Sequence, residues 1–172
     1  PELKNNVFSV ASEINQAVID FYTKMMARAE KIEAIKVSGQ VGTYKDFGFA
    51  PYFLVFDEFG AYYEMNDRLA YDDPTKASYE TAMSNLREIA MLGRELGFYI
   101  LIGMQRPDAG SLPMAIRNQL NMRINMGVPT PEIEKMVFPD NEKQLRPLSS
   151  HLKGWGFIKT VSYTHLTLPT KA

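Results

Sequence analysis

The sequence predicts an α/β protein built on a mostly parallel sheet that is flanked by helices. Two short apolar runs, at residues 52–56 and 98–104, are typical of strands that are buried on both faces. A long amphipathic segment separates the two runs, and the order strand, helix, strand predicts a parallel pair joined by a right-handed crossover. The composition suits such a fold, because 45% of the 172 residues are hydrophobic and 23% are charged.

Helices are expected before and between these strands. Over residues 7–35, apolar side chains recur every three or four positions, which predicts an amphipathic helix. A loop that contains several glycines is expected at 36–51. The second helix begins after Asp73, an N-cap residue followed by Pro74, and ends at Gly97. Both helices should therefore pack against the sheet.

The remaining elements of the domain are shorter. We expect a short helix at 113–120, a third strand at 122–128, one or two helical turns at 131–138, and a last strand at 155–158. No internal repeat interrupts this order.

The final residues, 161–172, break from the pattern. They are rich in Thr and resemble translated sequencing-adapter read-through, so we expect a non-native tail after a single domain at 1–160. The alternative is a genuine C-terminal strand at 161–168, since Thr, Val and Tyr favour strands.

The composition excludes several kinds of site. There is no cysteine, which rules out disulfides, thiolate metal sites and cysteine nucleophiles. The two histidines, His151 and His165, lack the spacing of metal ligands. A net charge of -1 gives no general attraction for nucleic acid, so any DNA contact must be local. The longest apolar stretch, 49–56, is too short to cross a bilayer.

Two acids follow the first strand directly. The four apolar residues 53–56 are followed directly by Asp57 and Glu58. This order, four apolar residues and then Asp-Glu, is the Walker B pattern. In that pattern the Asp orients magnesium against nucleotide phosphates, and the Glu polarises the attacking water. The alternative is an N-cap acid and a solvated neighbour at the end of a strand. Tyr62 and Tyr63, just beyond, are expected at the surface as a hinge or subunit contact.

Three segments extend the match, at 53–61, 86–97 and 100–107. Together they resemble the FtsK/SpoIIIE family of DNA-pumping ATPases, and most closely the coupling proteins of integrative conjugative elements. In that family a Walker B strand is followed by an acid-flanked helix and then by a strand that ends in a Thr-Gln-Arg-Pro-like turn. The resemblance extends to Lys159, with Met104 where Thr is common. It implies a partial P-loop NTPase domain of the RecA-like (ASCE) type.

The resemblance also implies roles for individual residues. Asp57 corresponds to the magnesium-associated acid and Glu58 to the catalytic base, so that both take part in nucleotide binding. Gln105 corresponds to the sensor that contacts the γ-phosphate, a task that suits an amide because it both donates and accepts. Arg123 is a candidate arginine finger acting in trans, with Arg117 as its rival, and structural pairing is the alternative for each.

The phosphate-binding loop is missing from this sequence. A P-loop requires Gly-x-x-x-x-Gly-Lys-Ser/Thr, yet none of the eleven glycines is followed by Lys. We therefore expect the chain to be the C-terminal half of a motor core, which alone neither binds ATP tightly nor hydrolyses it. Arg106, beside the sensor, is expected either to pair with an acid or to contact phosphate.

For the complete protein, the resemblance implies ATP and Mg²⁺ as cofactors, double-stranded DNA as cargo and assembly into a homo-hexamer. It also implies a membrane anchor outside this sequence, a place at the cytoplasmic face of the bacterial cell membrane, and a relaxase or other conjugation machinery as partner. The fragment itself is expected to be soluble and cytoplasmic. The alternatives are a ring ATPase of a protein secretion system, such as type VII, and an inactive truncated fragment. No DNA-contacting residue can be assigned from the sequence.

Overall fold

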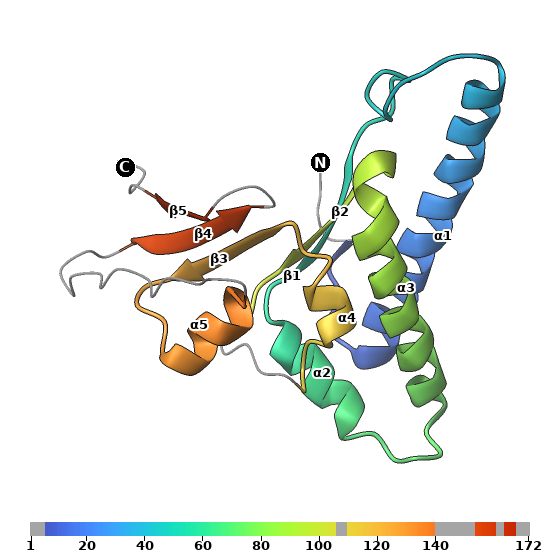
Figure 1. The fold of residues 1–172 in the computed structure, drawn as a ribbon. Helices are drawn as coiled ribbons and strands as arrows, with labels where there is room; N and C mark the ends of the chain where they lie inside the picture. Colours follow the sequence, from blue (N-terminus) through green and yellow to red (C-terminus); the bar gives the residue numbers. More distant parts are fainter. Residues whose placement is uncertain (1–5, 106–109, 140–153, 161–163, 168–172) are drawn as a thin grey trace. The chain divides into compact units, whose positions relative to one another are not determined.

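The computed structural model describes residues 6–105, 110–139, 154–160 and 164–167. The chain divides into two compact units, Pro1–Gln105 and Arg106–Ala172, and each is described by itself. Figure 1 shows the elements of both units in chain order.

The first unit has two strands and three helices. They are α1 (Ala11–Val37), β1 (Tyr52–Phe56), α2 (Phe59–Asp67), α3 (Pro74–Leu96) and β2 (Phe98–Ile102). Strands β1 and β2 pair in parallel, with Tyr52 opposite Phe98 and Phe56 opposite Ile102. The predicted parallel pair is confirmed, and α3 leads directly into β2. One further helix, α2, was not among the predicted elements.

Helix α3 begins and ends where the sequence predicts. The Asp73 side chain accepts a hydrogen bond from the Thr75 amide (2.8 Å), and Pro74 occupies the first turn. Gly97 closes the helix with a φ of 75°, in the left-handed region where side chains are strained. The ring of Tyr44 packs against Gly97 at the place where a Cβ would lie.

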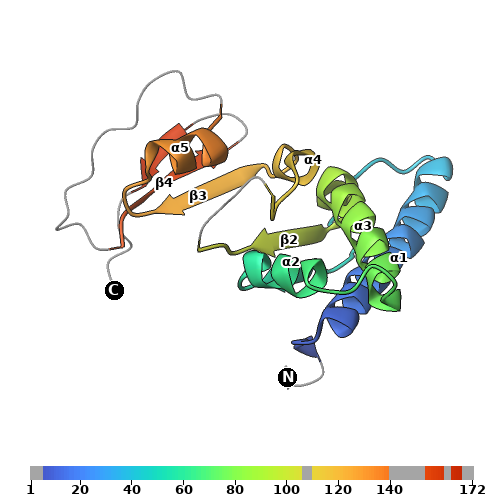
Figure 2. The same ribbon diagram turned by 90° about the horizontal axis from the view of Figure 1, so that it is seen from below.

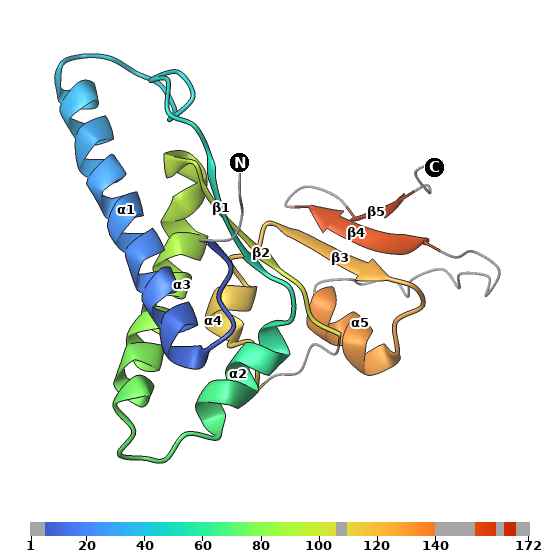
Figure 3. The same cartoon turned by 180° about the vertical axis from the view of Figure 1, so that it is seen from behind.

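Helices α1 and α3 lie side by side on one face of the sheet, as Figures 1 and 3 show, and Figure 2 shows the same pair from below. The core between helices and sheet contains Met25, Ile89 and Phe98. On the other face Phe53, Val55 and Leu101 are 63%, 61% and 58% exposed. The expectation of strands buried on both faces is therefore wrong for this unit, because the pattern of an apolar run does not say how many layers cover it.

A buried cation joins α1 to the sheet. Arg28 is only 8% exposed, and its Nη1 donates to the Ala50 carbonyl and to the Leu96 carbonyl, each at 2.9 Å. The guanidinium also lies over the rings of Phe49, Tyr52 and Phe98, at 5.1, 4.8 and 4.6 Å from their centroids. Arg28 thus connects α1 to the segments that precede β1 and β2.

The second unit contains α4 (Met114–Arg117), β3 (Met122–Met126), α5 (Pro131–Val137), β4 (Gly156–Thr160) and β5 (Thr164–Thr167). The strands form an antiparallel sheet in the order β3-β4-β5. The predicted elements are present, and the sheet of the first unit is parallel and flanked by helices as expected. The antiparallel direction of β4 was not predicted.

Strand β5 lies inside the segment that we expect to be non-native. It pairs antiparallel with β4, for example with Thr164 opposite Lys159. A short Thr-rich stretch can add in this way to any free strand edge. Within the described residues, no helix is long and apolar enough to cross a membrane.

Candidate functional site

The carboxyl ends of β1 and β2 meet at one edge of the parallel sheet. The hydrogen-bond ladder continues past the strands, since the Gly103 amide donates to the Phe56 carbonyl (2.8 Å) and the Phe59 amide donates to the Gly103 carbonyl (2.9 Å). The acids Asp57 and Glu58 therefore lie beside the turn at 103–105. This is the edge at which open α/β sheets bind ligands.

Gly103 allows the two segments to come this close. A Cβ at this position would overlap the Asp57 carbonyl oxygen and would lie 3.3 Å from the Phe56 carbonyl oxygen. Both neighbours are main-chain atoms, which cannot turn away as a flexible side chain can. Glycine is thus required here for close approach and not for an unusual φ.

The Glu58 side chain accepts hydrogen bonds from two segments at this edge, the start of α2 and the turn at 103–105. It is the N-cap of α2, where its Oε1 accepts from the Gly60 amide at 3.1 Å. Its Oε2 accepts from the main-chain amide of Gln105 at 2.9 Å. The N-cap alternative from the sequence is thus present in the structure. A carboxylate has about four acceptor sites, so two amide donors leave acceptor capacity for water.

The side chains of Asp57 and Gln105 are exposed, and Glu58 is half-buried. The structure brings the three residues together, but Gln105 meets Glu58 through its main chain. No group of three or more His, Cys, Asp or Glu among the described residues could hold a metal ion by itself. Asp57 nevertheless fits Mg²⁺, which proteins usually bind through one or two carboxylates with substrate phosphates and water as the other ligands.

The candidate arginines lie in the second unit. Arg123, on β3, donates from Nη1 to the Val137 carbonyl (3.2 Å) and from Nη2 to the Arg117 carbonyl (2.8 Å). These bonds join β3 to α4 and to the end of α5, so they favour the structural alternative for Arg123 within this chain. The Nη1 atom of Arg117 is buried without a hydrogen-bond partner among the described residues. Arg106 lies outside the described residues.

Tyr62 is 2% exposed, so its predicted place at the surface is wrong, while Tyr63 is half-buried. Burial raises the pKa of the Tyr62 hydroxyl, and burial raises the pKa of Tyr79 to about 12. Tyr62 belongs to a buried polar cluster that also includes Asn15 and Asn66. No local sequence pattern indicates this cluster, because an isolated Asn in a helix is usually exposed.

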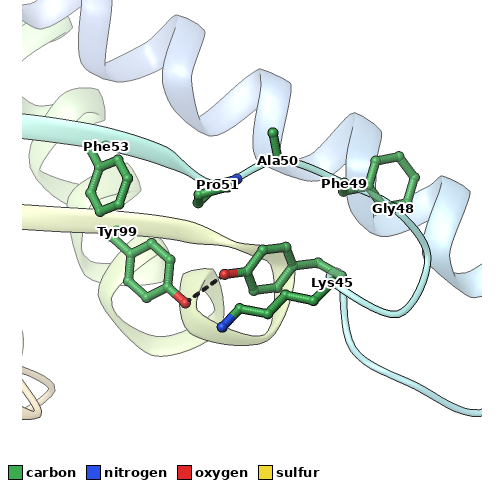
Figure 4. Close-up of a pocket in the computed structure, with 8 residues that line it drawn as sticks. Lys45, Gly48, Phe49, Ala50, Pro51, Phe53 and Tyr99 are labelled. Carbon is green, nitrogen blue, oxygen red and sulfur yellow. Dashed lines mark hydrogen bonds between the residues drawn. The ribbon is translucent and has the colours of Figure 1, made fainter.

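An open pocket of about 580 Å³ lies at the opposite, amino-terminal end of the strands. Its lining is Tyr44, Lys45, Gly48, Phe49, Ala50, Pro51, Phe53 and Tyr99. The hydroxyls of Tyr44 and Tyr99 lie 3.1 Å apart. The Phe53 ring stacks on the Tyr99 ring, and Figure 4 shows these two side chains next to each other. The pocket contains none of the predicted site residues, so the chemistry expected from the sequence belongs to the other end of the sheet.

No family model matches the chain. Over 167 residues, or 97% of its length, the chain is 28% identical to the FtsK domain-containing protein YdcQ of Bacillus subtilis (strain 168), and it covers 33% of that protein. The chain therefore spans about a third of the length of this curated relative.

Two solved structures have a similar fold. The pCW3 conjugation coupling protein TcpA, in a monomer form with ATPgS, matches with a TM-score of 0.65 and 22% identity over 90% of this chain and 42% of TcpA. The cytoplasmic domain of the Thermomonospora curvata type VII secretion ATPase EccC matches with a TM-score of 0.53 and 18% identity over 88% of this chain and 17% of EccC. The predicted α/β fold is thereby confirmed, and it is similar to part of each of these two proteins.

Proposed function

We propose that this chain, which is similar to an FtsK domain-containing protein and to two ATPases of known structure, is the part of an FtsK/SpoIIIE-type, ATP-driven DNA translocase that carries the Walker B acids. The observation that carries the proposal is the edge where β1 and β2 end. There Asp57 and Glu58 lie beside the turn at 103–105, and the Glu58 carboxylate accepts a hydrogen bond from the Gln105 amide at 2.9 Å. Walker B acids act next to such a turn in the family that the sequence resembles.

Each residue of the edge has a proposed task. Asp57, exposed at the end of β1, would hold Mg²⁺, which neutralises charge on the transferred phosphate. Glu58 would accept a hydrogen bond from the attacking water, while the amides of Gly60 and Gln105 fix the direction of its carboxylate. The exposed Gln105 side chain would donate to the γ-phosphate.

The remaining parts of the site would come from elsewhere. We infer that the P-loop lies in chain outside these 172 residues, since no glycine here precedes a Lys. The open sheet face with Phe53, Val55 and Leu101 supports this, because parallel sheets in complete domains are covered on both faces. Arg123 would act in trans within a homo-hexamer. The 172-residue chain alone would not hydrolyse ATP.

Double-stranded DNA is the proposed cargo, and conjugative transfer or chromosome segregation is the proposed process. TcpA, a conjugation coupling protein, has a TM-score of 0.65, compared with 0.53 for the secretion ATPase EccC. A membrane anchor outside this sequence and a relaxase or other conjugation machinery as partner belong to the same proposal. The whole protein would then lie at the cytoplasmic face of the cell membrane.

The test is ATP turnover of the upstream-extended protein, with and without double-stranded DNA. The wild type is compared with Glu58→Gln and with Glu64→Gln, a control that removes an exposed carboxylate from the same helix. We expect DNA to stimulate turnover in the wild type and the control, and turnover to be lost in Glu58→Gln. Turnover that depends on Glu58 but ignores DNA would favour a protein secretion ATPase. Turnover that survives Glu58→Gln would contradict the Walker B assignment.

A further inference from the structure

A cluster of buried polar side chains lies between α2 and the two long helices. Asn15 on α1 and Asn66 on α2 are both 0% exposed. The Oδ1 atom of Asn15 accepts from the Tyr62 hydroxyl at 2.7 Å, and its Nδ2 donates to Asn66 Oδ1 at 3.0 Å. We call these residues, together with Thr75 and Ser78 at the start of α3, the Asn15 cluster.

The cluster connects three helices. Besides Asn66 Oδ1, the Asn15 Nδ2 atom lies within hydrogen-bonding distance of Ser78 Oγ (3.1 Å) and of the Thr75 carbonyl (3.3 Å). Asn66 Nδ2 donates to the Tyr62 carbonyl at 2.8 Å. Buried polar groups are costly unless they are hydrogen-bonded, and these groups have such partners. The cluster is therefore a specific arrangement and cannot be a solvated surface.

Helix α2 needs such an arrangement because it is short. It has nine residues, whereas isolated helices below about 12 residues are marginal in water. Its buried face contains Phe59, Tyr62 and Asn66, at the spacing of one helical stripe. Apolar contacts of Phe59 allow a helix to slide or rotate, while hydrogen bonds are directional and fix both its rotation and its axial position.

Glu58 immediately precedes this helix and is hydrogen-bonded to its first turn. Glu58 is the N-cap of α2, and the Tyr62 amide donates back to the Glu58 carbonyl at 3.4 Å. A displacement of α2 along its axis would therefore carry the Glu58 carboxylate away from the Gln105 amide. The position of α2 is thus coupled to the contact between Glu58 and the turn at 103–105.

We propose that Asn15, Tyr62 and Asn66 are positioning residues for Glu58. Through α2 they hold the carboxylate at the end of β1, in contact with the Gln105 amide. The proposal rests on the proposed function only for its catalytic consequence, because the geometric consequence can be measured in the chain alone.

Tyr62→Phe is the most specific test of the cluster, because it removes a single hydrogen-bonding group. The ring packs against Phe56, Phe59 and Tyr79, with centroid distances of 5.3, 5.5 and 5.6 Å, and these contacts stay. Only the hydroxyl is lost, which leaves the buried Asn15 Oδ1 without this donor. Tyr79→Phe is the matched control, since it removes a hydroxyl from a neighbouring ring that is outside the cluster.

The first readout is amide hydrogen exchange in the 172-residue chain. The amides of Gly60 and Gln105 both donate to Glu58, so they report its position. In Tyr62→Phe we expect them to exchange about tenfold faster, as for the loss of one buried hydrogen bond, while the amide of Ile89 in α3 keeps its rate. The control should match the wild type. A uniform rise at all amides, or no change at Gly60 and Gln105, would overturn the proposal.

The second readout is steady-state ATP turnover in the upstream-extended protein. Tyr62→Phe should lower kcat and change KM little, because the contact of Glu58 with the attacking water would strengthen in the transition state, whereas the variant keeps the Glu58 carboxylate for nucleotide binding. An unchanged kcat beside faster exchange at Gly60 would overturn the catalytic part of the proposal. If Glu58→Gln itself retains activity, the proposed function fails, whereas the exchange experiment still decides whether the cluster positions Glu58.

Discussion

Replacing Gly103 with Ala should separate the ends of β1 and β2. The added Cβ would overlap the Asp57 carbonyl oxygen, and relief of this overlap requires the two main chains to move apart. That movement weakens the bond from Gly103 N to Phe56 O (2.8 Å), the bond from Phe59 N to Gly103 O (2.9 Å) and the bond from Gln105 N to Glu58 (2.9 Å).

The expected loss follows from these contacts. Three hydrogen bonds at about 1 kcal/mol each give about 3 kcal/mol, and the lower chain entropy of Ala in the unfolded state returns about 0.5 to 1 kcal/mol. The free energy of unfolding should therefore fall by about 2 kcal/mol. With an m-value of about 2 kcal/mol per molar urea, the unfolding midpoint shifts down by about 1 M.

The assay is urea unfolding of the chain, followed by far-ultraviolet circular dichroism, together with hydrogen exchange at the Gln105 amide. Gly127→Ala is the control, because a Cβ there would meet no atom within 4 Å and only the positive φ of 80° is strained. The control should lose about 1 kcal/mol and keep the wild-type exchange rate at Gln105. An unchanged midpoint in Gly103→Ala would refute the inferred close packing of the edge.

Three further predictions concern stability and surface. Arg28→Met should lower the free energy of unfolding by about 3 to 5 kcal/mol, since two part-buried hydrogen bonds from a charged donor are lost; a urea midpoint equal to that of the wild type would contradict it. Hydrogen bonds from the side chain and main chain of Thr75 lower the pKa of Asp73, so the stability from this cap exists above the unfolded pKa of 3.8 and is lost as pH falls through the folded pKa. Acid titration followed by circular dichroism should show this loss in the wild type and not in Asp73→Asn, which caps without titrating; equal acid sensitivity of both would count against it. Because the chain has no cysteine, Leu101→Cys can be labelled with a maleimide, and it should react quickly in the 172-residue chain and slowly in the upstream-extended protein. Met91→Cys on α3, starting from a 52% exposed side chain, should react quickly in both; equal rates for Leu101→Cys in the two proteins would show that its sheet face stays open.

Much of the first unit could be predicted because its signals are local. The apolar runs gave β1 and β2, and the Asp73 cap and Gly97 fixed the ends of α3. The convergence of Asp57 and Glu58 with the turn at 103–105 followed from parallel pairing alone, since both strands end at the same edge. These features depend on residues close together in the sequence or on one topological rule.

Other features depend on contacts that no local pattern encodes. The contact between Glu58 and the Gln105 main chain spans 47 residues, and main-chain donors have no signature in a sequence. The burial of Tyr62 depends on Asn15, which is 47 residues away in another helix. The antiparallel direction of β4 depends on pairing with β3 through a long connection. In each of these three cases the structure depends on a contact with a residue that is distant in the sequence, and not on the local sequence pattern.

The most direct test of the central claim separates ATP binding from ATP hydrolysis at Glu58. In the upstream-extended protein, equilibrium binding of Mg²⁺-ATP and single-turnover hydrolysis would be measured for the wild type, Glu58→Gln and the control Glu64→Gln. We predict that Glu58→Gln binds nucleotide with the affinity of the wild type and hydrolyses it at least about a hundredfold more slowly, while the control is unchanged in both. Hydrolysis by Glu58→Gln at the wild-type rate would contradict the assignment of Glu58 as the residue that activates water.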